Sequence, residues 1–285
     1  MRTLADLRGL RATVQAWKKE GRRVGFVPTL GNLHAGHYSL VELARRSADR
    51  VVASVFVNPT QFGPREDYTR YPRTLAEDSV GLVEHQCDLL FAPAVETVYP
   101  SGPEHALRIH VADLGDPLEG EFRPSHFDGV VTVVAKLLAM VQPDLAVFGA
   151  KDWQQLLVVQ RLVRELALPV EIVAGPTVRE PDGLAMSSRN RYLDAAQRAR
   201  APQLHATLEW MRESFLEGHA RAAIEGAAKR RLERAGFAAD YAVVRRAADL
   251  GLPADGERTG LMALVAARLG ETRLIDNEFF SCDHP

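Results

Sequence analysis

The sequence predicts an α/β protein, with a doubly wound, Rossmann-like parallel-sheet domain over residues 1–176 and a smaller α+β domain over residues 177–285. Short apolar runs alternate with helix-like stretches through the first two-thirds of the chain, which is the order of βαβ units. After residue 176 the alternation ends, and helical stretches rich in Ala, Arg, Glu and Leu precede strand-like runs. A length of 285 residues accommodates two such domains.

In the first domain, apolar runs bounded by turns indicate the strands, and periodic apolar residues indicate the helices. The run VVASVFV at 51–57 is β-branched and nearly continuous, which is typical of a strand buried on both faces. In chain order we expect strands at 23–28, 51–57, 88–92, 145–148 and 170–174. We expect helices at 38–48, 74–86, 129–141 and 153–166.

In the second domain, Asp194 is expected to N-cap a long helix that runs to about Gly218, and a second helix follows to about Gly236. Strands are expected at 241–244, 261–267 and 272–276. The chain shows no internal repeat, no low-complexity tract and no Ser/Gly linker. We therefore expect the two domains to be hinged closely rather than joined by a flexible tether.

Composition and charge exclude several classes of protein. The 35 Lys and Arg residues nearly balance the 37 Asp and Glu, whereas proteins that coat nucleic acid need clustered cations. Two cysteines, Cys87 and Cys282, are too few for a disulfide framework or a Cys-based structural zinc site. The start of the chain lacks the apolar core of a secretory signal, and Thr132 and Lys136 interrupt the most apolar stretch, at 130–141. We expect a cytoplasmic protein with no nucleic-acid or membrane partner.

The sharpest local feature is the segment PTLGNLHAGH at 28–37, which we call the His turn. It follows an apolar strand, its glycines relax the backbone, and His34 and His37 stand three residues apart at the start of a predicted helix. A helix N-terminus attracts phosphate, and two imidazoles at this spacing can donate hydrogen bonds to its oxygens. Two alternatives are surface histidines in a glycine turn, and a zinc site, which would need a further ligand that no nearby Cys or His supplies.

Two further polar clusters follow other predicted strands. Residues 149–152 (GAKD) place Lys151 at the carboxyl end of a strand, where it can reach a phosphate across a cleft. Residues 56–62 (FVNPTQF) carry Asn58 and Gln61, whose amides suit a small substrate with hydroxyl and carboxylate groups. The alternative for residues 149–152 is that Asp152 caps the following helix, and the alternative for residues 56–62 is a turn built on Asn-Pro.

The last cluster, MSSRN at 186–190, lies beyond the domain junction. Ser187 and Ser188 beside the guanidinium of Arg189 form an oxyanion-binding set, with a polar turn before a helix as the alternative. Because parallel strands share one carboxyl edge, we expect all four clusters to gather around one anionic ligand. The chain has neither GxxxxGK[ST] nor GxGxxG, which excludes a P-loop ATPase and a standard dinucleotide dehydrogenase.

Taken together, five segments resemble the pantothenate synthetase (pantoate–β-alanine ligase) family, which belongs to the HxGH nucleotidylyltransferase superfamily. The segments are GFVPTLGNLHAGHYSLV, FVNPTQFGPREDYTRYPRT, FRPSHFDGVVTVVAKLL, FGAKDWQQ and GPTVREPDGLAMSSRNRYL. The resemblance covers nearly all of residues 24–193 in order. Beyond residue 193, only residues 240–241 and 274–277 are similar to family positions.

The resemblance implies a two-step, ATP-dependent reaction. The carboxylate of pantoate attacks the α-phosphorus of ATP and gives pantoyl adenylate and pyrophosphate. The amine of β-alanine then attacks the acyl carbon and releases AMP and pantothenate. Mg2+ is implied with ATP, since phosphate oxygens call for a hard cation. A homodimer is also implied, and the second domain is expected to act as a lid that keeps water off the adenylate.

The resemblance also implies roles for individual residues. The implied catalytic residues are His34, His37, Lys151 and Arg189, and the implied substrate-binding residues are Asn58, Gln61 and Gln155. The residues implied to contact ATP are Pro28, Thr29, Leu30, Gly31, Asn32, Leu33, His34, Ala35, Gly36, His37, Gly149, Ala150, Lys151, Asp152, Val178, Met186, Ser187, Ser188 and Arg189. A protein contact to Mg2+ is expected at the acidic pair Glu77 and Asp78.

Three positions depart from the family pattern. Leu30 and Thr60 stand where the family commonly has Met, and Ala150 stands where it commonly has Glu. Thr60 is expected to enlarge or rehydrate part of the pantoate pocket. The alternatives to this function are another HxGH adenylyltransferase that acts on a phosphate-bearing acceptor, a tRNA-binding synthetase fragment, and a nucleotide sensor without turnover.

Overall fold

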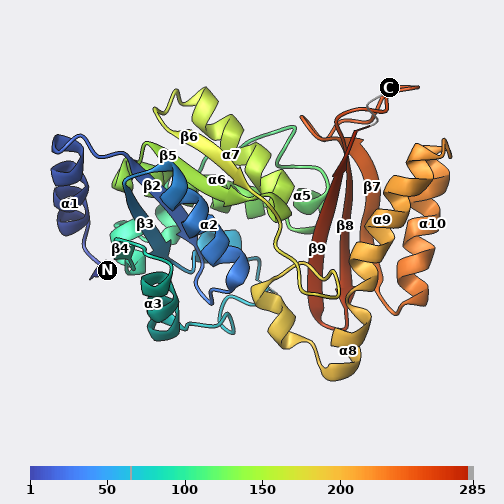
Figure 1. Cartoon of the computed structure of the whole chain (residues 1–285), viewed down its shortest axis with the longest axis horizontal. Coiled ribbons are helices and arrows are strands. Elements are labelled where there is room, and N and C mark those ends of the chain that lie inside the picture. The colour runs from blue at the N-terminus through green and yellow to red at the C-terminus, as the bar shows by residue number, and fades with distance from the viewer. Residues whose placement is uncertain (65, 282–285) are drawn as a thin grey trace. The chain divides into compact units, whose positions relative to one another are not determined.

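The computed structural model describes residues 1–64 and 66–281, which divide into two compact units (Figure 1). The first unit comprises Met1–Ala150 and Gln154–Pro176. The second comprises Lys151–Trp153 and the described residues from Thr177 on. Cys282 lies outside the described residues. Among the described helices, none has the length and apolar character needed to cross a bilayer.

The first unit is built on a six-stranded sheet in which every pairing is parallel. The strands are β1 (Arg2–Leu4), β2 (Val24–Thr29), β3 (Arg50–Val55), β4 (Leu89–Phe91), β5 (Leu145–Gly149) and β6 (Glu171–Gly175), in the spatial order β1-β4-β3-β2-β5-β6. The chain leaves β2 for β3 on one side and later returns to β5 on the other. The carboxyl ends of β2 and β5 therefore flank the switch point, where open α/β sheets bind ligands.

Helices cover both faces of this sheet. Val27, Val51 and Ala53 pack in one core cluster with residues of α2. Their sequence neighbours Phe26 and Val52 point to the opposite face and are equally buried. The helices of the first unit are α1 (Leu7–Lys19), α2 (Ala35–Ser47), α3 (Leu75–Glu84), α4 (Val95–Val98), α5 (Glu119–Phe122), α6 (His126–Val141) and α7 (Trp153–Glu165, whose first residue belongs to the second unit). The predicted doubly wound fold is confirmed.

The N-terminal strand β1 and helix α1 were not expected from the sequence. Asp6 N-caps α1 by accepting a hydrogen bond from the backbone N–H of Gly9. Leu10 and Val14 are the buried residues of the helix, and charged residues occupy much of the rest. The charged residues of this segment hide a narrow apolar stripe that packs against α6 and β2.

The second unit carries a three-stranded antiparallel sheet, β7 (Ala238–Arg246), β8 (Leu261–Leu269) and β9 (Thr272–Phe280), in that spatial order. Its helices are α8 (Ala195–Arg200), α9 (Gln203–Leu216) and α10 (Arg221–Arg234). Asp194 caps α8 as predicted, with a capping box to Gln197. The single long helix predicted after Asp194 is wrong, because Pro202 lacks an N–H and the chain breaks there into α8 and α9.

Short 3₁₀ turns carry several of the expected site residues. They are η1 (Pro59–Gln61), η2 (Pro103–His105), η3 (Ala150–Asp152) and η4 (Ser188–Tyr192).

Candidate active site

The His turn joins β2 to α2 at the carboxyl end of a central strand. His34 is the N-cap of α2, and its Nδ1 accepts a hydrogen bond from the backbone N–H of Gly36 at 3.2 Å. Nδ1 of His37 accepts from the backbone N–H of His34 at 3.4 Å, which completes a capping box. The two ring centroids are 4.1 Å apart, so the imidazoles lie together.

These caps fix where the protons of the two rings lie. Because both Nδ1 atoms accept N–H groups, the neutral imidazoles of His34 and His37 carry their proton on Nε2. The turn thus provides two ring N–H donors at the positive end of the α2 dipole. Such fixed donors can stabilise negative charge that develops on a phosphate group.

The carboxylate of Asp78, on α3, holds the backbone of the His turn. Its two oxygens accept hydrogen bonds from the N–H groups of Asn32 at 3.0 Å and Leu33 at 2.8 Å. Thr74 also donates to Asp78, at 3.2 Å, and Asp78 is only 2% exposed. Gly31 is required here: its φ is +86°, and a Cβ would lie 3.1 Å from Asp78 Oδ2.

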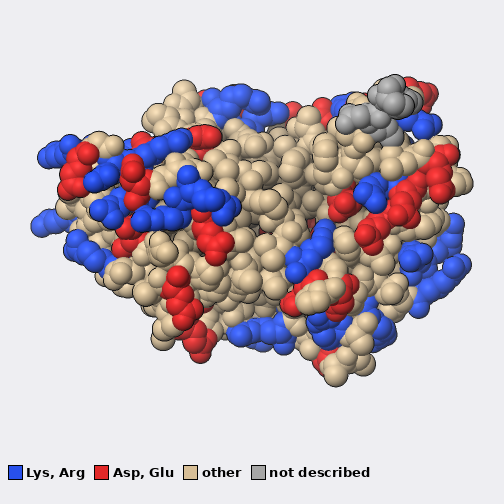
Figure 2. All heavy atoms as spheres, in the orientation of Figure 1, with Lys and Arg blue, Asp and Glu red and all other residues tan. Residues whose placement is uncertain are grey.

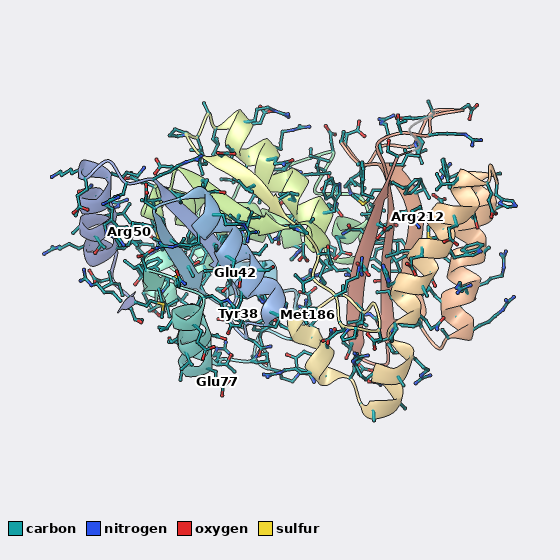
Figure 3. The ribbon with its side chains drawn as sticks, viewed as in Figure 1. Tyr38, Glu42, Arg50, Glu77, Met186 and Arg212 are labelled. Atoms are coloured by element: carbon teal, nitrogen blue, oxygen red, sulfur yellow. The ribbon has the colours of Figure 1, made fainter. Side chains whose placement is uncertain are left out.

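The acidic pair expected to contact Mg2+ does not form a joint site. Glu77 is exposed on α3 (Figure 3). Asp78 is buried and accepts hydrogen bonds from the backbone of the His turn. Consecutive helix residues point about 100° apart, which separates the two carboxylates. No group of three or more His, Cys, Asp or Glu among residues 1–64 and 66–281 could hold a metal ion. We therefore assign Asp78 to holding the turn, which corrects the expectation of a two-carboxylate site.

Asn58, which follows β3, is fully buried and fully hydrogen-bonded. Its Nδ2 donates to Gln61 Oε1 at 3.0 Å and to the carbonyl of Gly129 at 3.1 Å. Its Oδ1 accepts from the hydroxyls of Tyr99 at 2.7 Å and Thr60 at 3.0 Å. Both amide protons and the oxygen are therefore occupied within the protein, and Asn58 holds the amide oxygen of Gln61.

Thr60 departs from the family pattern without leaving its hydroxyl unsatisfied. Besides bonding Asn58, it lies 3.1 Å from the hydroxyl of Tyr99. Where a larger apolar side chain was expected, this chain therefore has a small polar network. Because the Thr60 hydroxyl has partners in this network, the change from Met to Thr leaves no unpaired hydroxyl in the pocket. Thr is smaller than Met, so the side chain fills less of the pocket.

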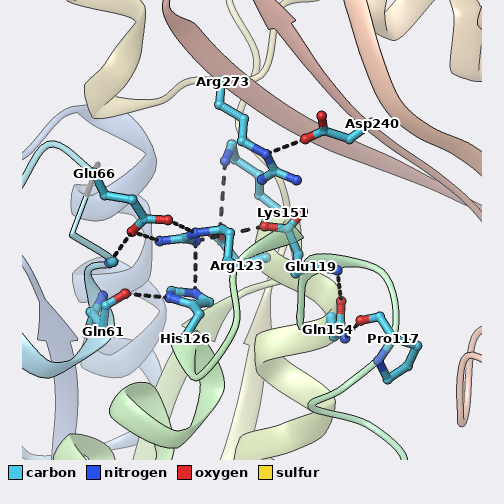
Figure 4. Close-up of polar contacts among 12 residues, drawn as sticks. Gln61, Glu66, Pro117, Glu119, Arg123, His126, Lys151, Gln154, Asp240 and Arg273 are labelled. Atoms are coloured by element: carbon cyan, nitrogen blue, oxygen red, sulfur yellow. Dashed lines mark hydrogen bonds and ion pairs between the residues drawn. The ribbon is translucent and has the colours of Figure 1, made fainter. Parts of the chain in front are cut away.

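The two glutamines at the start of α7 have different surroundings. Gln154 is buried and donates from Nε2 to the carbonyls of Leu114 at 2.7 Å and Pro117 at 2.8 Å, while its Oε1 accepts from the N–H of Glu119 (Figure 4). Gln154 thus fixes the loop before α5. Gln155, the predicted substrate-binding residue, is half-buried.

Lys151 belongs to the second unit, although it follows a strand of the first. Its carbonyl accepts a hydrogen bond from Asn277 Nδ2 at 2.7 Å, and Trp153 Nε1 donates to the carbonyl of Ala247 at 2.9 Å. Lys151 Nζ lies 3.9 Å from Asp152 Oδ1. The segment 151–153 is therefore pinned at both ends to residues of β9 and the β7–β8 connection.

The serine and arginine cluster is anchored to the same strand. Arg179 Nη1 donates to Asp276 Oδ2 at 2.6 Å, and Met186 N donates to the carbonyl of Val178 at 2.9 Å. Ser187 caps η4 by accepting from the N–H of Arg189 at 3.2 Å. The neighbours Asp276 and Asn277 of β9 thus hold both segments of this unit that carry expected phosphate ligands.

The structure therefore groups the expected residues in two sets. The first unit holds residues 28–37, Asn58, Gln61, Asp78, Gly149, Ala150 and Gln155. The second unit holds Lys151, Asp152, Val178, Met186, Ser187, Ser188 and Arg189. The sequence did not indicate the anchoring roles of Asp78, Asp276 and Asn277. A weak signal existed for the last two, which lie in a stretch similar to the family.

Comparisons with known proteins agree with the motifs. The family model for pantoate–β-alanine ligase matches residues 2–279. The chain is 58% identical to a pantothenate synthetase from Xanthomonas oryzae pv. oryzae over 277 residues, which is 97% of this chain and 99% of that protein. It is also 58% identical to a pantothenate synthetase from Xylella fastidiosa over 276 residues, 96% of this chain and 98% of that protein.

Solved structures show the same likeness. The crystal structure of pantothenate synthetase from Thermus thermophilus matches with a TM-score of 0.91 and 50% identity, over 98% of this chain and 99% of that one. Pantoate–β-alanine ligase from Francisella tularensis, complexed with β-γ ATP and β-alanine, matches with a TM-score of 0.83 and 31% identity, over 98% of this chain and 97% of that one. The resemblance drawn from the five sequence segments is confirmed.

Proposed function

The chain belongs to the pantoate–β-alanine ligase family, and we propose that it joins pantoate to β-alanine at the expense of ATP through a pantoyl-adenylate intermediate. In the first step a pantoate carboxylate oxygen bonds to the α-phosphorus and pyrophosphate leaves. In the second step the amine of β-alanine bonds to the acyl carbon, loses a proton, and AMP leaves. The observation that carries this proposal is the match to pantothenate synthetases over nearly the whole chain.

The His turn supports the adenylation step. Phosphoryl transfer depends mainly on positioning and on neutralising charge. We propose that His34 and His37 direct their Nε2–H groups at the phosphate oxygens, where negative charge grows as pyrophosphate departs. Their Nδ1 atoms are occupied by backbone N–H groups, so the donors are preorganised.

We further propose that both units contribute to ATP binding. Lys151, Ser187, Ser188 and Arg189 carry the cationic and hydroxyl groups that suit a triphosphate. The nucleoside is assigned to Gly149, Asp152, Val178 and Met186, and the remaining ATP contacts to the His turn. The shared anchor on Asp276 and Asn277 supports a joint action of the second-unit residues. Closure of this unit as a lid is part of the same proposal.

Pantoate is assigned to the glutamines of the first unit. Gln61 is nine-tenths buried, and its amide oxygen is held by Asn58, so its Nε2–H groups are oriented for an external acceptor. Gln155 complements it from α7. The structure of the Francisella tularensis relative with β-alanine supports that amino acid as the second substrate.

Mg2+ is proposed to accompany ATP and to be bound mainly by phosphate oxygens, which suits a cation that keeps several waters. The pair Glu77 and Asp78 does not fit as its protein site, because Asp78 already accepts two backbone N–H groups. No step of the mechanism is assigned to that pair.

The partners and location are proposed on family membership. We propose a homodimer in the cytoplasm with no nucleic-acid or membrane partner. Lys and Arg are interspersed with Asp and Glu on the visible surface, which agrees with the balanced net charge of −2 (Figure 2). Sedimentation equilibrium tests the dimer, and a single-chain mass at micromolar concentration would reject it.

Mass spectrometry tests the reaction directly. Pantothenate is expected when ATP, pantoate and β-alanine are all present, and not when any one is omitted. The alternative of another HxGH adenylyltransferase predicts ATP–pyrophosphate exchange with a phosphate-bearing acceptor instead of pantoate. A sensor without turnover predicts ATP binding and no exchange.

A further inference from the structure

A hydrogen-bonded chain of four residues joins the loop after β3 to the start of α6 (Figure 4). Arg123 donates from Nε to Glu66 Oε1 at 2.6 Å and from Nη2 to Glu66 Oε2 at 2.9 Å. Arg123 Nη1 lies 2.9 Å from His126 Nε2, and His126 Nδ1 lies 2.8 Å from the carbonyl oxygen of Gln61. We call Glu66, Arg123, His126 and Gln61 the His126 chain.

The partners of His126 determine its tautomer. A carbonyl oxygen can only accept, so Nδ1 of His126 carries the proton and donates it to Gln61. A guanidinium can only donate, so Nε2 is unprotonated and accepts from Arg123. This tautomer is opposite to that of His34 and His37, whose Nδ1 atoms accept hydrogen bonds.

The environment keeps the His126 ring neutral. Burial and the positive charge of Arg123 lower the pKa of His126 to about 3, although the hydrogen bond to Gln61 and the carboxylates of Glu119 and Glu66 act in the opposite direction. Water has little access to the residue, which is only 8% exposed. Over the neutral range His126 is therefore a fixed donor and acceptor.

The hydrogen bond from His126 reaches Gln61, whose backbone and side chain are also restrained by other contacts. Gly129 of α6 packs so tightly on η1 that a Cβ would lie 2.3 Å from the carbonyl oxygen of Thr60 and 2.6 Å from the Cα of Gln61. Asn58 holds the amide oxygen of Gln61 at 3.0 Å. Gln61 is thus held at its carbonyl by His126 and at its side chain by Asn58.

We propose that His126 is a positioning residue for Gln61: as the Nδ1–H tautomer, supported by Arg123 and Glu66, it fixes the Gln61 carbonyl and so orients the glutamine amide toward the hydroxy-acid substrate. The inference rests on the proposed function, in which Gln61 binds pantoate. It adds the residues that hold Gln61 in place, and none of these residues touches the reacting atoms.

Nitrogen NMR of the ¹⁵N-histidine-labelled enzyme tests the tautomer without relying on activity. The signal absent in His126→Asn should show a pyrrole-type Nδ1 and a pyridine-type Nε2, and should not titrate between about pH 5 and pH 8. Exposed His110, whose pKa is raised by Asp128, serves as a control that titrates. An Nε2–H tautomer or a protonated ring at neutral pH would overturn the inference, whatever the enzyme's substrates prove to be.

Kinetics test the positioning role. His126→Ala should raise the KM for pantoate about tenfold and change the KM for ATP by less than about twofold, the effect of losing one buried hydrogen bond near one substrate. His126→Asn should recover most of the loss, because its amide can donate to Gln61 and accept from Arg123. His110→Ala is the matched control and should leave both KM values unchanged.

Two results would contradict this role. One is an equal rise of both KM values in His126→Ala; the other is an Asn variant no better than the Ala variant. If His126→Ala does not fold, Glu66→Gln replaces it, since it weakens the support of Arg123 without touching the core. It should raise the KM for pantoate about threefold, and an unchanged KM would count against the chain. If wild type forms no pantothenate at all, the proposed function fails while the tautomer result still stands or falls by itself.

Discussion

The two units build their parts of the site by different means. In the first unit, the His turn lies where a parallel strand ends and a helix begins, and one buried carboxylate, Asp78, gathers its backbone N–H groups. In the second unit, Lys151 and the 186–190 cluster lie in loops that are tied to β9 by Asp276 and Asn277. The end of a parallel strand determines where the His turn lies. Individual buried polar side chains determine where Lys151 and residues 186–190 lie. The two sets should therefore respond differently to substitution.

The largest effect is expected within the His turn itself. His37→Ala should lower kcat by about two to three orders of magnitude, because it removes one preorganised donor to the developing phosphate charge. The circular dichroism spectrum should be unchanged. His85→Ala, at a half-buried histidine just beyond the end of α3, is the control and should keep near-native kcat. A folded His37→Ala enzyme with near-native turnover would show that the His turn is not part of the active site.

The second-largest effect is expected for Asp78, the carboxylate that holds the His turn. Asp78→Asn should lower the free energy of unfolding by about 1–3 kcal/mol, because an amide offers one acceptor oxygen where two backbone N–H groups need partners. Urea denaturation measures the loss, and kcat should fall with it. Glu77→Gln, one residue away and exposed, should leave both quantities unchanged. Equal effects of the two substitutions would mean that the pair acts as a shared anionic site after all.

The anchor of the second unit should show a different kinetic pattern. Asn277→Ala should raise the KM for ATP about five- to tenfold with a smaller effect on pantoate, because it releases the carbonyl of Lys151. Gln155→Ala should give the reverse, with the larger rise in the KM for pantoate. Steady-state titration of each substrate, with the other substrates saturating, distinguishes the two kinetic patterns. If both variants shift both KM values equally, the assignment of Lys151 to the triphosphate and of Gln155 to pantoate is wrong.

The last prediction concerns pH and the His126 chain. The pKa of His126 is lowered to about 3 in the folded protein by burial and by Arg123, with Glu119 and Glu66 opposing. Below about pH 6.5 the unfolded chain therefore binds a proton that the folded chain does not. The free energy of unfolding should fall by up to about 1.4 kcal/mol per pH unit as the pH drops from about 6 to 4. His126→Asn should remove this contribution from the slope, and an unchanged slope would contradict it.

Local patterns were enough to predict the sheet and most of its helices, since burial on both faces of β3 and the period of α7 are visible in adjacent residues. They failed for α1, where frequent Arg and Lys mask Leu10 and Val14, and at Pro202, where a long Ala-rich pattern hides a break. The motifs identified the candidate site residues, but they did not identify the side chains that hold those residues in place.

The supporting contacts could not be read from spacing because they join distant parts of the chain. Asp78 bonds a residue 46 positions away, and Asn277 bonds one 126 positions away. In each contact a side chain bonds to a backbone group. Such contacts leave no periodic pattern in the sequence and do not involve neighbouring residues. For the same reason the sequence did not indicate that Asp78 holds the His turn or that Asn58 holds the side chain of Gln61.

Isotope exchange between pyrophosphate and ATP shows whether the His turn catalyses adenylation of pantoate, because exchange isolates this step from the later attack by the amine. We predict exchange that requires pantoate, proceeds without β-alanine, and falls by about two to three orders of magnitude in His37→Ala. Exchange that ignores pantoate, or that survives intact in a folded His37→Ala protein, would contradict the account.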